Sequence, residues 1–464
     1  MSESEKLRQA RALASRHGQE HLLRYYDGLA PSEREILLDQ VLSVDYENLA
    51  ALHRSLVASP PAEGPHGSIA PLQAKAWEDF GASEHAAMTD MGMRALREGK
   101  VAAFLVAGGQ GTRLGHDGPK GIFDIGLPSR KSLFQLQAER ILRLSRQAGK
   151  ALPWYVMTSE ENHAATVAFF REKKYFGHPE KDVFFFRQGE LPVVDSRGKI
   201  LLASKGSLSR GPNGNGGCFL ALSESGALDD MRRRGVEYLF FYSVDNALVR
   251  VCDPAFVGFA MQSGLPAASK AVAKASPEEK VGVLCLRDGR PTVLEYSEMT
   301  EAMIRERTPE GRLRFDSANV AMHLFTREFL EAEAASPLPY HVAQKKITCL
   351  GDDGERVVPE RPNAFKFEMF MFDIFPRAKG MAALTVRREE EFAPVKNRDG
   401  VDSPATARAL VLDLHRKWAL TAGLTEEELR GKTLEVSPLV SYAGEGIDPA
   451  QIRSQLGNPI IQVS

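Results

Sequence analysis

A glycine-rich segment with two cations is the part of this sequence best suited to chemistry. It runs from Val106 to Gly121 (VAGGQGTRLGHDGPKG) and carries Arg113 and Lys120. Glycines let the backbone approach a ligand closely, and successive amides can point at phosphate oxygens. The planar guanidinium of arginine matches a phosphate, and a lysine adds a mobile point charge. Together these groups could neutralise a polyphosphate and stabilise the charge that develops on a leaving pyrophosphate.

Two familiar phosphate-binding motifs do not fit this segment. A P-loop requires Ser or Thr after its lysine, but Lys120 is followed by Gly121, and the glycine spacing also differs. A dinucleotide fingerprint requires a glycine where Leu114 stands, and Gly115 comes one residue too late. Neither an ATPase nor a dehydrogenase is therefore well supported.

The glycine-rich segment lies between a predicted strand and a predicted helix. Val101–Val106 is a short apolar run, typical of a buried strand, and residues 132–146 have helical spacing. Strands are then predicted at 154–158, 183–186 and 238–244, alternating with helices at 162–174, 217–234 and 253–263. This alternation predicts an α/β fold with a Rossmann-like, mostly parallel sheet covered by helices on both faces. Ligands bind such sheets beyond the carboxyl ends of the strands.

The segment before this region has a different character. Residues 1–95 show helical spacing and predict a helical N-terminal domain, which leaves residues 96–404 for the α/β domain. Ser32, with Glu35 three residues later, is predicted to be the N-cap of one of these helices.

The C-terminal part is expected to be a small separate domain. Residues 405–464 begin with a predicted helix at 405–419 and end in strand-like stretches at 438–442 and 459–463. A β-hairpin is predicted earlier, at 282–297, around a strong Asp-Gly turn pair.

The overall composition excludes several classes of protein. Of 464 residues, 43% are hydrophobic and 26% charged, which is ordinary globular usage. Lys plus Arg number 59 and Asp plus Glu 61, so the formal net charge of −2 offers no bulk attraction to nucleic acid. The longest stretch without a charge, residues 254–269, contains Pro, Gly and Gln and is too short to span a membrane.

The cysteines and the N-terminus predict the compartment. The 4 cysteines show no CxxC spacing and do not form a disulfide framework. The first residues are polar and lack the apolar core of a signal peptide. A cytoplasmic protein without a nucleic-acid or membrane partner is expected, as a monomer or a weak homo-oligomer.

Further motifs follow the glycine-rich segment and cover most of residues 100–446. In chain order they are Ala107–Gly115, Pro119–Gly121, Gly126–Lys131, Phe134–Arg140, Gln188–Pro192, Pro212–Gly217, Val244–Asn246, Leu294–Glu298, His341–Lys346, Lys366–Phe375, Phe392–Asn397 and Pro438–Gly446. This series resembles the uridylyltransferases that make UDP-sugars, the UDP-sugar pyrophosphorylase family. Within that family it is most similar to the eukaryotic-type UDP-N-acetylhexosamine pyrophosphorylases.

The resemblance implies a nucleotidyltransferase with a GT-A-like α/β fold. It also implies the reaction of UTP with N-acetylglucosamine 1-phosphate to give UDP-N-acetylglucosamine and pyrophosphate, with Mg²⁺ or Mn²⁺. The sugar-phosphate nucleophile needs no general base, because the second phosphate pKa is ~6. The site must instead align two anions and stabilise the displaced pyrophosphate, which calls for cations, amides and a metal.

The resemblance further implies individual roles. The residues expected to act in catalysis are Arg113, Lys120 and Lys396. Those expected to bind the nucleotide are Val106, Ala107, Gly108, Gly109, Lys120, Gln188, Gly214, Asp245 and Lys366. Those expected to bind the sugar phosphate are Asn215, Gly282, Glu295, Tyr296, Asn319 and Lys396. Asp245 follows a predicted strand and is the candidate metal ligand, since Mg²⁺ takes one or two carboxylates plus substrate phosphates. His323 and His341 are predicted to be structural or peripheral.

Three alternatives stay open at this point. The same chemistry could use N-acetylgalactosamine, glucose or galactose 1-phosphate, although Gln110–Arg113 and Pro119–Gly121 favour the N-acetylhexosamine branch over the glucose branch. A glycosyltransferase on a similar sheet commonly carries Asp-x-Asp, whereas Val244–Asn246 has no second Asp at that spacing. A nucleotide-sugar sensor with a decayed site is expected to lack Arg113, Lys120 or Asp245, and all are present.

Overall fold

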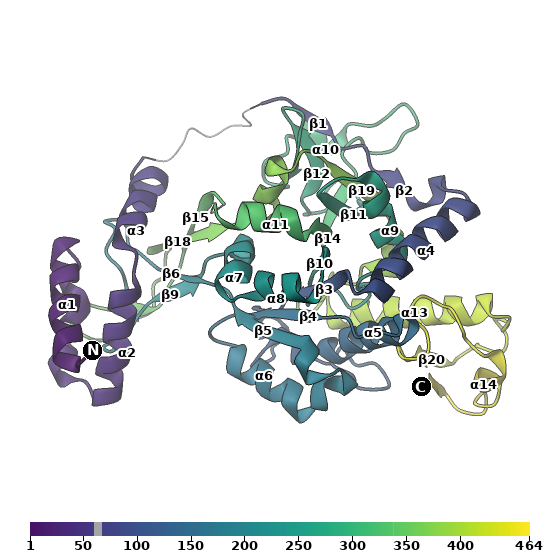
Figure 1. The fold of residues 1–464 in the computed structure, drawn as a ribbon, viewed down its shortest axis with the longest axis horizontal. Coiled ribbons are helices and arrows are strands. Elements are labelled where there is room, and N and C mark those ends of the chain that lie inside the picture. The colour runs from purple at the N-terminus through teal and green to yellow at the C-terminus, as the bar shows by residue number, and fades with distance from the viewer. Residues whose placement is uncertain (60–66, 337) are drawn as a thin grey trace. The chain divides into compact units, whose positions relative to one another are not determined.

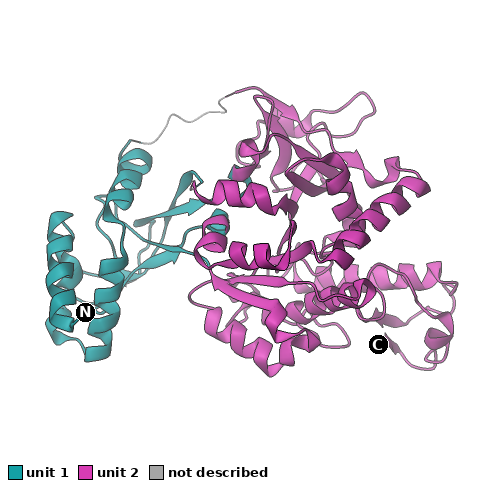
Figure 2. Cartoon of the chain, in the orientation of Figure 1, with its two compact units in different colours: residues 1–65, 188–218, 337–373 teal, residues 66–187, 219–336, 374–464 magenta. Residues whose placement is uncertain are grey.

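The computed structural model describes residues 1–59, 67–336 and 338–464, which form two compact units (Figure 2). Unit 1 contains residues 1–65, 188–218 and 337–373, and unit 2 contains the remainder. The units therefore do not follow the predicted limits at residues 95 and 404. Among the described residues, no helix is both long enough and apolar enough to cross a membrane.

Unit 2 is built on a mixed sheet, in which the described residues form 11 strands (Figure 1). Its main path, in spatial order, is β2 (Lys75–Ala76), β19 (Met381–Thr385), β11 (Ala267–Ala273), β14 (Ser317–Thr326), β10 (Tyr238–Ser243), β3 (Val101–Val106), β4 (Trp154–Thr158) and β5 (Val183–Arg187). Along this path β14 is antiparallel to both neighbours, and the other pairings are parallel. The predicted hairpin is confirmed as β12 (Val283–Arg287) and β13 (Arg290–Leu294), to which β1 (Ile69–Pro71) adds a third strand.

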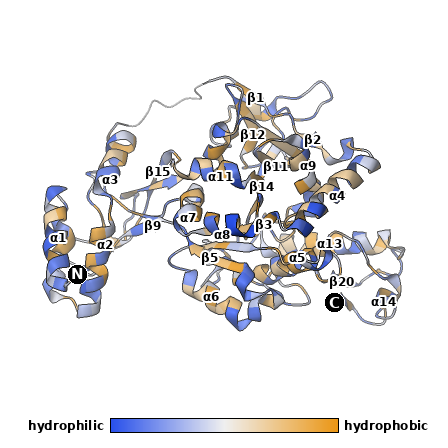
Figure 3. Cartoon of the chain, in the orientation of Figure 1, coloured by the Kyte–Doolittle hydropathy of each residue, from blue (hydrophilic) through white to orange (hydrophobic). Residues whose placement is uncertain are grey.

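Helices cover both faces of this sheet. One face is covered by α4 (Ala82–Glu98), α5 (Leu133–Ala148), α6 (His163–Glu172) and α9 (Pro254–Ser263). The other is covered by α7 (Cys218–Glu224), α8 (Ala227–Arg234) and α11 (Arg327–Ala334). On α8, Ala227, Leu228 and Met231 are buried, while the other residues are charged (Figure 3). The predicted α/β fold with a mostly parallel sheet is confirmed.

The predicted helix at 217–234 is wrong in one respect, because it is two helices. Gly226 has a φ of 77° and separates α7 from α8. This left-handed conformation cannot continue an α-helix, and glycine adopts it without steric cost.

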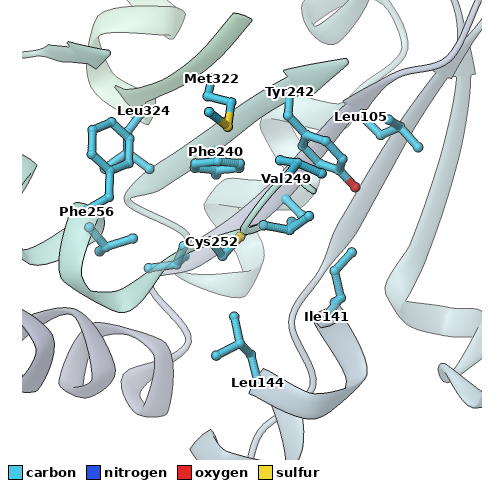
Figure 4. Close-up of a cluster of buried hydrophobic side chains, with 14 of the residues drawn as sticks. Leu105, Ile141, Leu144, Phe240, Tyr242, Val249, Cys252, Phe256, Met322 and Leu324 are labelled. Carbon is cyan, nitrogen blue, oxygen red and sulfur yellow. The ribbon is translucent and has the colours of Figure 1, made fainter. Parts of the chain in front are cut away.

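The main hydrophobic core lies between the sheet and its first helical layer (Figure 4). It joins side chains from adjacent strands to the inward faces of α4, α5, α6 and α9, since alternate strand residues point to the same face. Among the contributors are Leu105, Phe240, Tyr242, Met322 and Leu324 from the strands and Ile141, Leu144 and Phe256 from the helices. This packing fixes where β3 and β10 end.

Helices α4 and α9 cross at unusually close range, and glycine makes this possible. A Cβ on Gly92 would lie 1.9 Å from the carbonyl oxygen of Pro254, and a Cβ on Gly258 would lie 1.9 Å from that of Met88. Since α4 is held by this crossing, residues 66–95 belong to unit 2 rather than to a helical N-terminal domain.

We expect Gly258→Ala to lower the free energy of unfolding of unit 2 by about 1–3 kcal/mol, because the added methyl must push the two helices apart. All 3 tryptophans, Trp77, Trp154 and Trp418, lie in unit 2, so urea unfolding followed by tryptophan fluorescence measures this unit. Gly457→Ala is the control, since nothing lies within 4 Å of a Cβ there. An unchanged midpoint for Gly258→Ala would contradict the close crossing.

The remaining elements of unit 2 are α10 (Glu301–Arg305), α12 (Arg388–Glu391), α13 (Pro404–Thr421), β20 (Thr433–Val436), α14 (Pro449–Arg453) and β21 (Ile460–Val463). β20 and β21 pair in parallel, so the predicted strand at 459–463 is confirmed. The predicted strand at 438–442 is wrong, and the strand is β20 instead. Pro438 has no amide hydrogen with which to continue a ladder, and the chain turns there.

Unit 1 joins three helices to short strand pairs from distant parts of the chain. The helices are α1 (Glu3–Arg16), α2 (Pro31–Ser43) and α3 (Tyr46–Leu52). Two strand pairs come from the middle of the chain, β6 (Glu190–Pro192) with β9 (Arg210–Pro212) and β7 (Leu202–Ser204) with β8 (Ser207–Leu208). Two more come from further along, β15 (Tyr340–Lys345) with β18 (Ala364–Met369) and β16 (Cys349–Leu350) with β17 (Arg356–Val357). They share one hydrophobic cluster, in which Leu22 and Leu37 join Val194, Ile200 and Phe367.

The predicted N-cap of α2 at Ser32 is wrong. The helix begins at Pro31, and the backbone amide of the preceding Ala30 donates to Glu33 Oε2 at 2.9 Å. Proline suits this first position, because its missing N–H is not needed there.

Candidate active site

The glycine-rich loop and Asp245 lie at the same edge of the sheet. β3 and β10 are parallel neighbours, and Val106 at the end of β3 is opposite Ser243 at the end of β10. β4 and β5 continue the sheet on the other side of β3, so β3 and β10 flank a topological switch point. The carboxyl ends of strands at a switch point are the usual ligand site of such sheets.

The glycine-rich loop is closed by its own main chain. The Gly111 amide donates to the Gly118 carbonyl at 2.8 Å. Gly111 is also required by close packing, since a Cβ there would lie 2.8 Å from the ring of His116. Arg113 and Lys120 each lie on a short 3₁₀ turn of this loop. The loop therefore presents both cations from a fixed frame.

Three successive backbone amides of the loop have no hydrogen-bond partner among the described residues. In the part of the chain that the structure describes, no acceptor bonds the amides of Gly108, Gly109 and Gln110. No atom lies within 4 Å of a Cβ position on Gly109, so this side of the loop is open. Unpaired amides in a glycine-rich turn form an anion-binding concavity.

The charges around the loop divide into paired and unpaired groups. Two cations after the loop form ion pairs within the protein, Arg130 with Asp124 at 2.9 Å and Lys131 with Glu139 at 2.6 Å. Arg113 and Lys120 have no carboxylate partner among the described residues. The two predicted phosphate-binding cations are thus the ones that remain available to a ligand.

Main-chain pairing places Lys396 beside Asp245. The amide of Val395 donates to the carbonyl of Asp245 at 2.9 Å, so the next residue, Lys396, lies next to the end of β10. Lys396 Nζ lies 3.4 Å from Asp402 Oδ2 and 5.7 Å from the centre of the Phe392 ring, with 44% of its side chain exposed. The structure therefore brings Lys396, Asp245 and the end of β10 together.

The Asp245 carboxylate itself is partly buried and has no hydrogen-bond or ion-pair partner among the described residues. No group of three or more His, Cys, Asp or Glu side chains that could hold a metal occurs within those residues. The described residues therefore offer no complete protein ligand set for a metal here.

Asn246 is a functional residue that the sequence analysis did not assign. It is 3% exposed, and its side chain donates to the Glu391 carbonyl at 2.7 Å and accepts from the Ala393 amide at 2.9 Å. These bonds fix the segment that carries Lys396. The Val244–Asn246 motif was the available signal, but only its Asp was given a role.

Three of the predicted sugar-binding residues lie together near the hairpin. The Asn319 amide donates to the Gly282 carbonyl at 2.8 Å, and a Cβ on Gly282 would lie 2.9 Å from Glu295 Oε1. Burial raises the pKa of the Glu295 carboxyl, and the neighbouring Glu298 adds to the effect. Asn319 is near the start of β14, which is antiparallel to β10, so it lies at the same sheet edge as Asp245. Tyr296 follows Glu295 and is 46% exposed.

Gln188, Gly214, Asn215 and Lys366 belong to unit 1. Asn213 connects their segments, because its amide donates to Gly189 at 3.0 Å and its carbonyl accepts from Met369 at 2.8 Å. Unit 1 thus gathers four of the predicted ligands from three separate stretches of chain.

Within unit 1, these residues differ in how far they are engaged. Gly214 has a φ of 84°, and a Cβ there would lie 2.3 Å from the carbonyl oxygen of Met369, so only glycine fits. Asn215 Oδ1 accepts from the Met371 amide at 2.9 Å, which leaves its amide nitrogen available. Lys366 has no carboxylate partner in the described part of the chain.

The chain matches the family model described as UTP–glucose-1-phosphate uridylyltransferase over residues 67–447. It is 42% identical to human "UDP-N-acetylhexosamine pyrophosphorylase-like protein 1", over 97% of this chain and 96% of that protein. It is also 42% identical to "UDP-N-acetylglucosamine diphosphorylase 2" of Arabidopsis thaliana, over 93% and 89%.

Among solved structures, it is similar to the uridine diphosphate N-acetylglucosamine pyrophosphorylase of Trypanosoma brucei, crystallised with an inhibitor. The TM-score is 0.84 at 31% identity, covering 100% of this chain and 98% of that one. The matched region thus spans residues of both units. On these grounds the chain belongs to the UTP–glucose-1-phosphate uridylyltransferase family, the family that the sequence motifs indicate.

Proposed function

We propose that this protein is a uridylyltransferase that converts UTP and N-acetylglucosamine 1-phosphate into UDP-N-acetylglucosamine and pyrophosphate. The observation that carries the proposal is the loop after β3. Its open amides and two cations lack partners among the described residues, and they lie at the same sheet edge as the Asp245 carboxylate, which lacks one there too. This set of groups suits a polyphosphate. The choice of a uridine nucleotide and an N-acetylhexosamine as substrates rests on the names of the relatives.

The reaction is an in-line displacement at the α-phosphorus of UTP. A phosphate oxygen of the sugar phosphate forms the new P–O bond, the bond to the β-phosphate oxygen breaks, and pyrophosphate leaves with the electron pair. The loop amides, Arg113 and Lys120 reduce the repulsion between the two anions and stabilise the charge on pyrophosphate. Lys396, beside the strand end, orients the attacking sugar phosphate.

We infer that Asp245 holds Mg²⁺ or Mn²⁺. Mg²⁺ is usually held by one or two carboxylates together with waters and substrate phosphates, and the single unpaired carboxylate of Asp245 fits this pattern. Such a metal would shield the phosphate charges during transfer. The four buried, free cysteines suit a reducing compartment, so we place the reaction in the cytoplasm.

We assign the parts of the two substrates to individual residues as follows. Gln188 reads the uracil edge, Gly214 lies against uridine and Lys366 binds nucleotide phosphate. The sugar and its acetamide are assigned to Asn215, Gly282, Glu295, Tyr296 and Asn319. The second candidate is the same reaction with N-acetylgalactosamine, glucose or galactose 1-phosphate, and the hexosamine is favoured because the relatives' names specify it.

The test is pyrophosphate release from UTP by purified protein with Mg²⁺. We expect release only after a sugar 1-phosphate is added, and fastest with N-acetylglucosamine 1-phosphate in a panel containing the N-acetylgalactosamine, glucose and galactose compounds. No release with any of them would refute the enzyme proposal, and a preference for glucose 1-phosphate would favour the second candidate.

Lys396→Ala is expected to raise the KM for the sugar 1-phosphate about tenfold, the equivalent of ~1.4 kcal/mol, while the Kd for UTP changes less than about twofold. The reason is that Lys396 is assigned to the sugar phosphate, whereas the loop amides, Arg113 and Lys120 are assigned to the nucleotide. Steady-state kinetics and calorimetry with UTP measure the two effects. Equal losses for both substrates would contradict the assignment.

A further inference from the structure

A buried side chain beside the glycine-rich loop has no role in the assignments above. Asn162 precedes α6 and is 1% exposed. Its Nδ2 donates to the Ala107 carbonyl at 2.8 Å and lies 3.4 Å from the Gly109 carbonyl. Its Oδ1 accepts from the Ser159 amide at 2.9 Å, which fixes the orientation of the side-chain amide. A rotated amide would place its NH₂ against another N–H.

The geometry of the peptide unit gives these two bonds a consequence. In a trans peptide, the carbonyl of one residue and the N–H of the next point in opposite directions. Holding the Ala107 carbonyl therefore turns the Gly108 N–H away from Asn162, and the Gly109 carbonyl and Gln110 N–H are related in the same way. Both of these N–H groups are among the amides without an acceptor in the described residues.

We propose that Asn162 is a positioning residue for the nucleoside triphosphate. By holding the Ala107 carbonyl, and by sharing the Gly109 carbonyl with the Lys120 amide, which donates to it at 3.1 Å, it aims the Gly108 and Gln110 N–H groups at a phosphate on the open side. Asn162 does not touch the substrate and acts through the backbone. The loop thus meets the triphosphate with its donors already oriented, which lowers the entropic cost of binding. This inference deepens the proposed uridylyl transfer and rests on it.

A purely local role for Asn162 is the competing explanation, and substitutions separate the two. Asn162 and Ser159 form a turn before α6, since Ser159 Oγ also accepts from the Asn162 amide at 3.2 Å. Asn162→Asp keeps the acceptor for the Ser159 amide but faces the loop carbonyls with a carboxylate oxygen. Asn162→Leu removes the donor without adding charge. Ser159→Ala weakens the turn and leaves the loop contacts in place.

We expect Asn162→Asp and Asn162→Leu to raise the Kd and KM for UTP at least ~10-fold, the equivalent of ~1.4 kcal/mol. The KM for the sugar 1-phosphate should change less than about twofold, which also shows that the fold is intact. Ser159→Ala should lower Tm but keep the UTP affinity. Wild-type UTP affinity in Asn162→Leu, or an equal loss in Ser159→Ala, would overturn the proposal.

The wild-type protein provides a second measurement that does not depend on the variants folding. Hydrogen exchange of a peptide spanning residues 106–111 should slow when UTP and Mg²⁺ bind, because the open amides then find acceptors. Unchanged exchange at saturating UTP would also overturn the proposal. If the protein binds UTP but releases no pyrophosphate with any sugar 1-phosphate, the proposed function fails, while UTP calorimetry still tests Asn162.

Discussion

Asp245→Asn is expected to lower kcat/KM by about 10³-fold, or ~4 kcal/mol of transition-state stabilisation, with little change in stability. The carboxylate follows β10 at the switch point and forms no ion pair or hydrogen bond with the described residues. An asparagine of the same shape keeps the backbone pairing to Val395 and removes the charge that the proposed metal would require. The substitution should therefore lower kcat/KM without lowering the free energy of unfolding.

Asp90→Asn is the matched control for this experiment. Asp90 is an exposed acid on α4, outside the glycine-rich loop, and it too has no partner in the described ranges, so the change in net charge is identical. We expect its kcat/KM to stay within about threefold of wild type, as for surface substitutions away from a site. Manganese binding, followed by electron paramagnetic resonance with UTP present, should be lost in Asp245→Asn only. Wild-type manganese affinity in Asp245→Asn would contradict the metal assignment.

The elements next to the site were predictable because their signals are local. Val101–Val106 and Trp154–Thr158 are uninterrupted apolar runs, and the structure has β3 and β4 with these limits. A run buried on both faces needs no knowledge of its neighbours to be read as a strand. The glycine-rich segment follows β3 in the chain, and Asp245 follows β10. The sequence alone therefore predicts that both lie at the carboxyl ends of strands.

The parts that escaped prediction depend on contacts between distant residues. β11 (Ala267–Ala273) is made largely of small side chains and carries Lys270, so its sequence lacks the apolar signal of a buried strand. Only its place between β14 and β19 makes it one. Likewise, residues 188–218 and 338–373 join α1–α3 through shared burial, which no local pattern reveals. The role of Asn162 has the same origin, because it depends on a loop 53 residues away.

The unpredicted Lys270 leads to the second large expected effect. Lys270 is completely buried, and its Nζ lies 2.6 Å from Asp253 Oδ2 and 2.5 Å from Glu391 Oε2. Burial alone would raise the pKa of Asp253, but the charges of Lys270 and Arg250 lower it below its usual value. The Asp253 carboxylate is therefore held ionised in the interior by these cations, and Lys270 pairs with Glu391 as well. Removing one partner of such a group leaves a buried charge uncompensated.

Lys270→Met is expected to lower the free energy of unfolding of unit 2 by about 3–5 kcal/mol. Lys417→Met is the control, since Lys417 is 47% exposed and pairs with Glu390 at the surface, where a pair contributes about 1 kcal/mol or less. Urea unfolding followed by tryptophan fluorescence measures both. The double variant Lys270→Met/Glu391→Gln should lose less unfolding free energy than the two single variants together. The reason is that it also removes the Glu391 carboxylate charge, which Lys270→Met alone leaves without its lysine partner. Additive losses would show that Lys270 and Glu391 are not coupled.

The same buried group connects stability to catalysis. Glu391 pairs with Lys270 through its side chain, and its carbonyl accepts from Asn246 next to Asp245. Loosening Glu391 should therefore disturb the segment that ends in Lys396 before the unit unfolds. We expect folded Lys270→Met, assayed well below its unfolding midpoint, to show a raised KM for the sugar 1-phosphate with a nearly unchanged Kd for UTP. This is the pattern expected of Lys396→Ala, here produced from a residue that touches no substrate. A wild-type KM would mean that the buried ion group stabilises unit 2 without positioning Lys396.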